Sequence, residues 1–364
     1  MRLVADAGLW STGPLARPTP LVAVLEVSGA VLEWTVDEPA GPAVTFTDLP
    51  RADWLWRVLG ESGHTAVAAA LDGRAPDVPQ TVELSDVNVV PEAVEPLRRL
   101  ALGHWLRRWW PTSHRDGIPG LDAAILDAEV ALLTAAAQEY FTDDTFDSDV
   151  AGLLVPHTAA LIALAGDGDP RVGELVGACS ELADDVGVAF DDQPLTEVAT
   201  RRRDDYALAA GADRGRTLGA IAGGVASVNW AAVPPGIFDA AEDTVEWRVE
   251  AAGSAINCIV RVELSGAGSP AGITVRLQSG AIVGSGELDA DGSATFPLQD
   301  AHGDPVTQTA AWDHDWRPTA VTIGADVDES RQTRERIRAF ARSRLDRPAS
   351  DAFLAEILAA ESDY

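Results

Sequence analysis

The sequence predicts a multidomain α+β protein, because the spacing of its apolar residues changes twice along the chain. Apolar and polar residues alternate over residues 20–90 and again beyond residue 227, which is the period of half-buried β-strands. Between these regions the apolar residues recur every three to four positions, which is the period of amphipathic helices. We therefore expect an α+β domain over 1–110, a helical domain over 111–226, an antiparallel β-sandwich over 227–328 and a helical tail over 329–364.

The first domain is predicted to hold a small antiparallel sheet with one short helix. Turn-forming pairs, Ser28-Gly29 and Glu38-Pro39, bound the first two strands. Strands are expected over 20–29, 30–39, 43–50 and 80–91, with a helix over 51–62.

A tryptophan-rich helix is expected from Glu92 to Trp110, where the sequence ends in HWLRRWWP. At 100° per residue its four arginines point in different directions and apolar residues surround the whole helix, which is typical of a buried helix. Pro111 ends the helix, and its arginines are expected to reach carboxylates at the surface of the core. A partner-binding edge is the alternative, because tryptophan and arginine are enriched at interface hot spots.

Four antiparallel helices are expected to follow, joined by short acidic loops. They are predicted over 120–141, starting at Asp122, and over 149–166, 169–187 and 194–211. Proline, glycine and charge interrupt the periodicity over 111–120 and 211–230, so both segments are expected to be linkers. Residues 213–230 are read as a short helix or an extended connector.

The C-terminal part of the chain carries strands with sharp turns at Gly280, Asp291-Gly292 and Gly303. From Ile273 to Leu298, a VRL strand, a strand ending near LDADG and an ATFPL strand resemble the prealbumin-like modules found as carboxypeptidase regulatory domains. The resemblance implies a β-sandwich of at most seven strands. Such modules usually bind or support rather than catalyse.

The charge of the chain excludes several classes of function. The net charge is −30, which argues against free nucleic acid and anionic membrane as partners. All 27 basic residues are arginine, so chemistry that needs a lysine is absent, and the composition is typical of a high-GC bacterium. We expect reduced, buried thiols at Cys179 and Cys258, no signal peptide, no apolar run of ~18 residues for a membrane span, no cofactor, and a cytoplasmic location.

The best candidate for chemistry is AWDHDWRP, residues 311–318. In an extended strand Trp312, His314 and Trp316 share one face and the flanking aspartates share the other. Structural packing, an aromatic binding platform and catalysis all remain open, and no residue is assigned as catalytic. The acidic run holding Asp143, Asp144, Asp147 and Asp149 could bind Ca²⁺, although it lacks the EF-hand order and also suits a helix start.

The tail concentrates positive charge behind an acidic body. Residues 331–364 carry seven arginines and six acids, a net charge of +1, whereas residues 1–330 carry 20 and 51, a net charge of −31. The first tail helix places Ile337, Phe340, Ala341 and Leu345 on one stripe, and Ser350 is expected to cap the second. The helix either docks on its own chain or binds a partner protein through Arg334, Arg338, Phe340 and Arg342; binding of nucleic acid is disfavoured.

These patterns favour a non-enzymatic binding or scaffold subunit of a bacterial multiprotein system, which contacts another protein through the sandwich and the basic helix. Bacterial proteins of this modular kind often accompany an ATPase or a protease encoded nearby. The alternative is an enzyme of an unfamiliar family with its site at a domain junction. Titratable groups that converge in one pocket favour the enzyme, and an exposed aromatic patch favours the binding protein.

Overall fold

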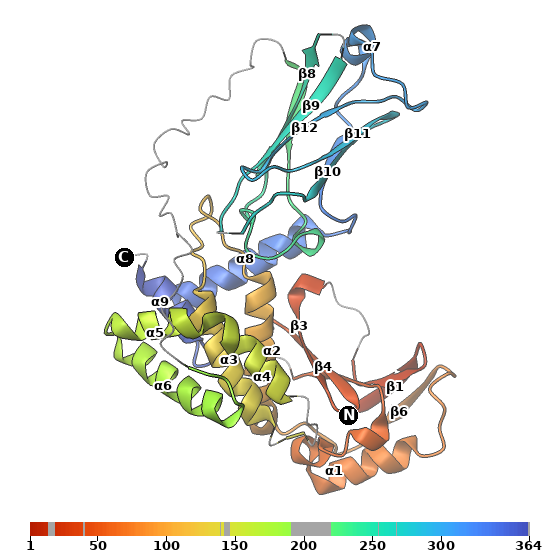
Figure 1. The fold of residues 1–364 in the computed structure, drawn as a ribbon. Helices are drawn as coiled ribbons and strands as arrows, with labels where there is room; N and C mark the ends of the chain where they lie inside the picture. The colour runs from red at the N-terminus through yellow and green to blue at the C-terminus, as the bar shows by residue number, and fades with distance from the viewer. Residues whose placement is uncertain are drawn as a thin grey trace. The chain divides into compact units, whose positions relative to one another are not determined.

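The computed structural model describes residues 1–13, 19–38, 41–138, 140–141, 146–190, 220–253, 255–266 and 268–362 (Figure 1). The described residues form helices and antiparallel sheets, which confirms the mixed α+β class. Contacts divide the chain into two compact units. Unit 1 contains Met1–Trp110, Leu121–Asp192 and Ser330–Tyr364, and unit 2 contains Pro111–Gly120 and Gln193–Glu329. This grouping differs from the four consecutive segments expected from the sequence.

Unit 1 contains a six-stranded antiparallel sheet in the order β3-β4-β5-β2-β1-β6. Its strands are β1 (Arg2–Asp6), β2 (Leu9–Ser11), β3 (Val22–Val27), β4 (Ala30–Thr35), β5 (Ala43–Phe46) and β6 (Gln80–Glu83). The expected turn between β3 and β4 is present, and Gly29 has a φ of 72° there. A methyl group at Gly29 would lie 2.2 Å from the carbonyl oxygen of Asp48, so only glycine fits.

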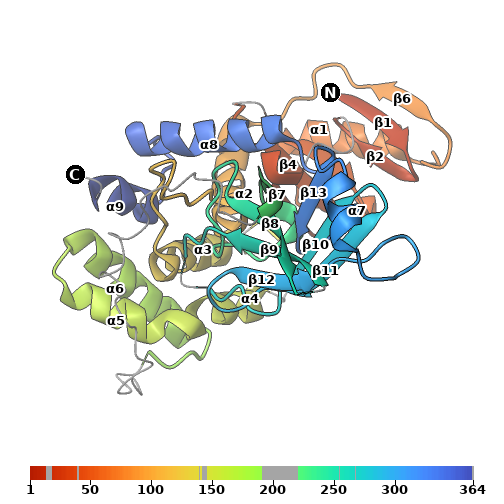
Figure 2. The same cartoon turned by 90° about the horizontal axis from the view of Figure 1, so that it is seen from above.

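The helices of unit 1 are α1 (Leu55–Leu71), α2 (Pro91–Trp109), α3 (Ala123–Ala137), α4 (Phe146–Leu154), α5 (Thr158–Gly166), α6 (Pro170–Asp185), α8 (Arg331–Asp346) and α9 (Leu354–Ser362). The carboxylate of Asp122 accepts a hydrogen bond from the amide of Ile125, which confirms Asp122 as the N-cap of α3. Helices α4, α5 and α6 all contact α3 (Figures 1 and 2). The helix predicted over 194–211 lies outside the described residues.

The burial predicted for the tryptophan-rich helix is confirmed in α2. Trp105 is 2% exposed, and its indole nitrogen donates to the carbonyl oxygen of Pro20 at 2.8 Å. The arginines of the helix meet three carboxylates, in the pairs Arg98–Asp351, Arg99–Glu129 and Arg107–Asp127. The helix is therefore a core element with snorkelling arginines as far as Leu106, whereas Trp109 and Trp110 at its end are only partly buried.

The sequence was expected to contain no apolar run long enough for a membrane span. The segment Asp149–Gly166 corrects this, because its 18 residues have a mean hydropathy of 1.5 and by length and composition could cross a membrane. The fold breaks this segment into α4 and α5, joined by a 3-10 turn at Val155–His157. Pro156 causes the break, since it lacks the backbone donor of a continuous helix. Length and hydropathy are weak evidence for a span, because helices that pack inside a protein meet the same criteria.

The two tail helices pack within unit 1. Helix α9 contacts α3, and α8 contacts the 3-10 turn at Thr19–Leu21. Phe353 is fully buried, and a methyl group at Gly103 of α2 would lie 3.0 Å from its ring. The expected cap at Ser350 is wrong, because α9 begins at Leu354. At the start of α9 the carboxylate of Glu356, the third residue of the helix, accepts a hydrogen bond from the amide of Phe353, the residue before it.

Unit 2 contains two antiparallel sheets, in the orders β11-β10-β13 and β12-β9-β8-β7. The strands are β7 (Ala220–Ala226), β8 (Val245–Ala252), β9 (Ala255–Val262), β10 (Thr274–Ser279), β11 (Ile282–Glu287), β12 (Ser293–Pro297) and β13 (Thr319–Ile323). Both sheets contribute to one apolar core, with Val249, Cys258 and Val260 from one and Val275 and Leu277 from the other. Cys258 in unit 2 and Cys179 in unit 1 are free, buried thiols, as expected.

Two segments of unit 2 differ from the sequence expectations. Residues 220–226 form β7 rather than a helix or connector. Residues Gln308–Asp313 form a short helix, α7, so Trp312 does not lie on the extended strand considered for residues 312–316. The hydroxyl of Thr307 accepts a hydrogen bond from the amide of Ala310 and caps α7, so the alternation of tryptophans is not a strand pattern here.

The expected linker over 111–120 is an anchored loop of unit 2. The buried carboxylate of Asp239 accepts hydrogen bonds from the Ser113 hydroxyl at 2.6 Å and from the amide of His114 at 2.8 Å. Arg115 donates to the backbone carbonyls of Glu242 and Asp243. These bonds hold residues 111–120 against the segment that precedes β8 in the same unit, so the loop is not the free linker that its composition predicts.

Candidate functional site

Trp312, His314 and Trp316, which we call the aromatic platform, lie where α7 ends and the chain turns toward β13. Trp312 belongs to α7, and His314 is the residue that ends the helix. The rings of His314 and Trp316 meet edge to face, with centroids 4.7 Å apart. Trp312 is 58% exposed. The structure thus brings His314 and Trp316 into contact through a helix end and a turn rather than through a shared strand face.

Hydrogen bonds hold the two inner rings of the aromatic platform in place. The Nε2 of His314 lies 2.9 Å from the Oγ of Ser279, and the hydroxyl of Thr319 donates to the same Oγ at 2.9 Å. The indole nitrogen of Trp316 donates to the carbonyl oxygen of Ala311 at 2.8 Å. Sequence reasoning missed Ser279, because it lies 35 residues before His314 and only strand pairing between β10 and β13 brings it close.

Ser279 and His314 have the spacing of a nucleophile and its base, but their surroundings oppose that role. Ser279 is 0% exposed, so its hydroxyl has no path to a substrate. The flanking Asp315 does not orient the imidazole, because it pairs with Arg317 at 2.6 Å. That hydrogen bond to Arg317 lowers the pKa of Asp315 to about 2. The arrangement therefore positions an aromatic ring and offers no acid–base pair to a ligand.

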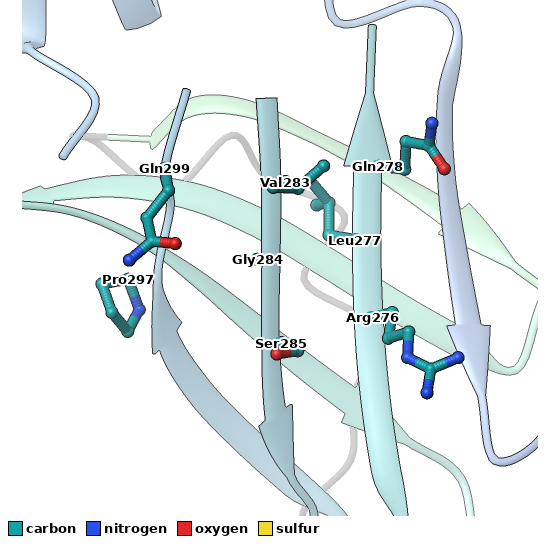
Figure 3. Close-up of a pocket in the computed structure, with 8 residues that line it drawn as sticks. All are labelled: Arg276, Leu277, Gln278, Val283, Gly284, Ser285, Pro297 and Gln299. Atoms are coloured by element: carbon teal, nitrogen blue, oxygen red, sulfur yellow. The ribbon is translucent and has the colours of Figure 1, made fainter. Parts of the chain in front are cut away.

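A pocket of about 340 Å³ lies on unit 2 beside β10 and β11 (Figure 3). Figure 3 shows Arg276 and Gln278 on β10 and Val283 and Ser285 on β11, with Gln299 on the neighbouring segment. Arg276 is the one charged side chain among the eight residues that line the pocket. The pocket can donate hydrogen bonds but holds no pair for general acid–base catalysis.

The remaining predicted site residues do not gather at one place. Arg334 and Arg338 are buried in α8, Phe340 is half-buried against Trp105, and Arg342 is exposed. Of the acidic run, Asp143 and Asp144 lie outside the described residues, as does the side chain of Asp147, while Asp149 is exposed in α4. In the described part of the chain, no group of three or more His, Cys, Asp or Glu side chains could hold a metal ion.

Comparison with known proteins gives no assignment of a family or an activity. No protein-family model matches the sequence, and no curated protein and no solved structure matches it significantly. The likeness of Ile273–Leu298 to prealbumin-like modules therefore stays a prediction.

Proposed function

We propose that the protein is a non-enzymatic binding subunit of a bacterial multiprotein system, and that it contacts a partner protein through the aromatic platform. One observation carries this proposal: Trp312 is 58% exposed at the end of α7, two residues before His314 and four before Trp316, whose rings hydrogen bonds hold in place. A large aromatic side chain left in solvent is the residue type that dominates protein–protein binding energy. In this proposal unit 2 acts as a β-sandwich module that presents the contact.

The rigidity of the aromatic platform supports this role. Binding loses free energy when flexible side chains become ordered, and the rings of His314 and Trp316, which are held before binding, avoid much of that cost. Around Trp312 the exposed side chains of Asp313, Asp315 and Arg317 supply a charged rim. An apolar anchor inside a polar rim is the usual anatomy of a protein interface.

The proposed contact surface does not include the tail helix α8. Arg334, Arg338 and Arg344 are buried in α8, so their charges serve the interior rather than a partner. An ATPase or a protease encoded nearby remains the proposed class of partner, and a cytoplasmic location remains part of the proposal. Cys179 and Cys258 are consistent with a reducing compartment, because both are free.

The test places a photoreactive phenylalanine analogue at position 312 of the full chain and irradiates it in native lysate. The matched control carries the same analogue at Trp56, an exposed tryptophan of unit 1. We expect a discrete protein cross-link from position 312 and none of the same size from position 56. We also expect Trp312→Ala to keep the melting temperature and lose the same complex. A complex that survives Trp312→Ala would refute the proposal.

A further inference from the structure

Unit 1 contains a cavity of about 450 Å³ between β3, α2, α3 and α4. Three buried leucines, Leu25, Leu100 and Leu153, supply an apolar part of the lining. Glu26, His104 and Asp149 add polar groups from three different elements. A volume of this size with an apolar lining and a few polar groups is typical of small-molecule sites.

His104 lines this cavity with an imidazole that makes no hydrogen bond to the described residues. Its imidazole has no hydrogen-bond partner among the described residues, although it lines the cavity and most of the ring is buried. Burial lowers the pKa of His104, and the positive charge of Arg107 lowers it further. Asp127 and Asp149 act in the opposite direction, but burial is the largest cause, so the lowered pKa favours the neutral ring, in which one nitrogen is an acceptor.

The charges around the cavity favour a cation. Arg107 lines the cavity but is neutralised by Asp127, with Nε 2.5 Å from Oδ1 and a terminal nitrogen 3.2 Å from Oδ2. Glu26 and Asp149 have no ion pair or hydrogen bond from a side chain within the described part of the chain. Two uncompensated carboxylates and one neutral acceptor make the local potential negative, and the chain's net charge of −30 adds to it.

We propose that this cavity binds a small organic ammonium ion whose hydrocarbon part packs on the three leucines. The ammonium group donates hydrogen bonds to Glu26, to Asp149 and to the free nitrogen of His104. An ammonium ion has three donors and no acceptor, so it suits a lining that offers acceptors from separate elements. The inference is independent of the aromatic platform, which lies in the other unit.

Calorimetric titration of the full chain with n-butylammonium and with 1,4-diaminobutane tests the proposal. The neutral isostere 1-butanol and the anion butyrate are the comparison ligands. We expect saturable binding of at least one amine and no measurable binding of the two comparison ligands. Binding of 1-butanol as tight as that of the amines would overturn the proposal, because it would show an apolar pocket without charge recognition.

Two exposed carboxylates allow variants that leave the fold intact. Glu26→Gln and Asp149→Asn should each weaken amine binding at least ~10-fold, because each removes a charge-assisted hydrogen bond. Asp313→Asn in unit 2 is the matched control, since it removes the same charge from an exposed position outside the cavity. Absence of saturable binding would overturn the proposal, as would an equal loss of affinity in the control variant.

Discussion

Glu356→Ala should destabilise unit 1 more than any single loss of a surface charge. Glu356 is 0% exposed, and its two carboxylate oxygens accept hydrogen bonds from Arg344 at 2.5 and 2.6 Å. Arg344 is 5% exposed and also donates to Asp351 at 3.0 Å. The same carboxylate accepts the amide of Phe353 at the start of α9. Removing it leaves a guanidinium in the interior with one remaining carboxylate partner.

Breaking a buried ion pair by deleting one member costs ~3–5 kcal/mol, because the other charge stays buried without its partner. That is a large part of the ~5–15 kcal/mol by which a domain of ordinary stability is folded. Hydrogen exchange of α9 should rise at the same time, because the amide of Phe353 loses its acceptor. The double variant Arg344→Met/Glu356→Leu should recover most of the lost stability, since apolar side chains of similar volume need no desolvated partner.

The assay is urea unfolding of the full chain followed by circular dichroism, with hydrogen exchange measured on α8 and α9. The control is Glu335→Gln, which breaks the exposed pair Arg331–Glu335 one turn apart on α8. Exposed pairs of this kind contribute less than ~1 kcal/mol. The reasoning is wrong if Glu356→Ala loses no more stability than the control, or if the double variant is less stable than both single variants.

Three further changes test the packing of unit 1. Trp105→Ala should cost ~3–5 kcal/mol by urea unfolding, because it opens a cavity in the core, and a normal melting temperature with a lost partner would instead make α2 an interface. Deleting residues 330–364 should lower the melting temperature, since Phe353 leaves a buried site; an unchanged value would mean that the tail does not dock. Burial raises the pKa of Glu129 from 4.5 to about 7, so the folded state holds this proton more tightly than the unfolded state. The contribution of Glu129 to the free energy of unfolding, at most roughly 3 kcal/mol, is present below pH 4.5 and is lost as the pH rises through 7. Glu129→Gln should therefore show a smaller fall in stability over this pH range than the parent protein. An equal fall in stability in variant and parent would contradict this.

The sequence was a reliable guide wherever a structural choice depends on neighbouring residues. The turn at Gly29, the N-cap at Asp122 and the helix that ends before Pro111 follow from backbone sterics and local hydrogen bonds. The burial of Trp105 followed from apolar residues around the whole helix. Alternation failed at residues 311–316, where the local cap at Thr307 starts a helix that the spacing of the tryptophans conceals.

Tertiary structure decided which distant groups meet, and sequence spacing carries no information about that. The sequence left open whether the arginines of the tail meet the chain's own carboxylates or a partner, and the fold places Arg344 beside Glu356 in the interior. The loop over 111–120 had the composition of a linker, but the buried carboxylate of Asp239 holds it in unit 2. Desolvation and electrostatics depend on distance in space, so the sequence determined the elements, while only the packed chain determined which charges are neutralised, which are buried and which remain free for a ligand.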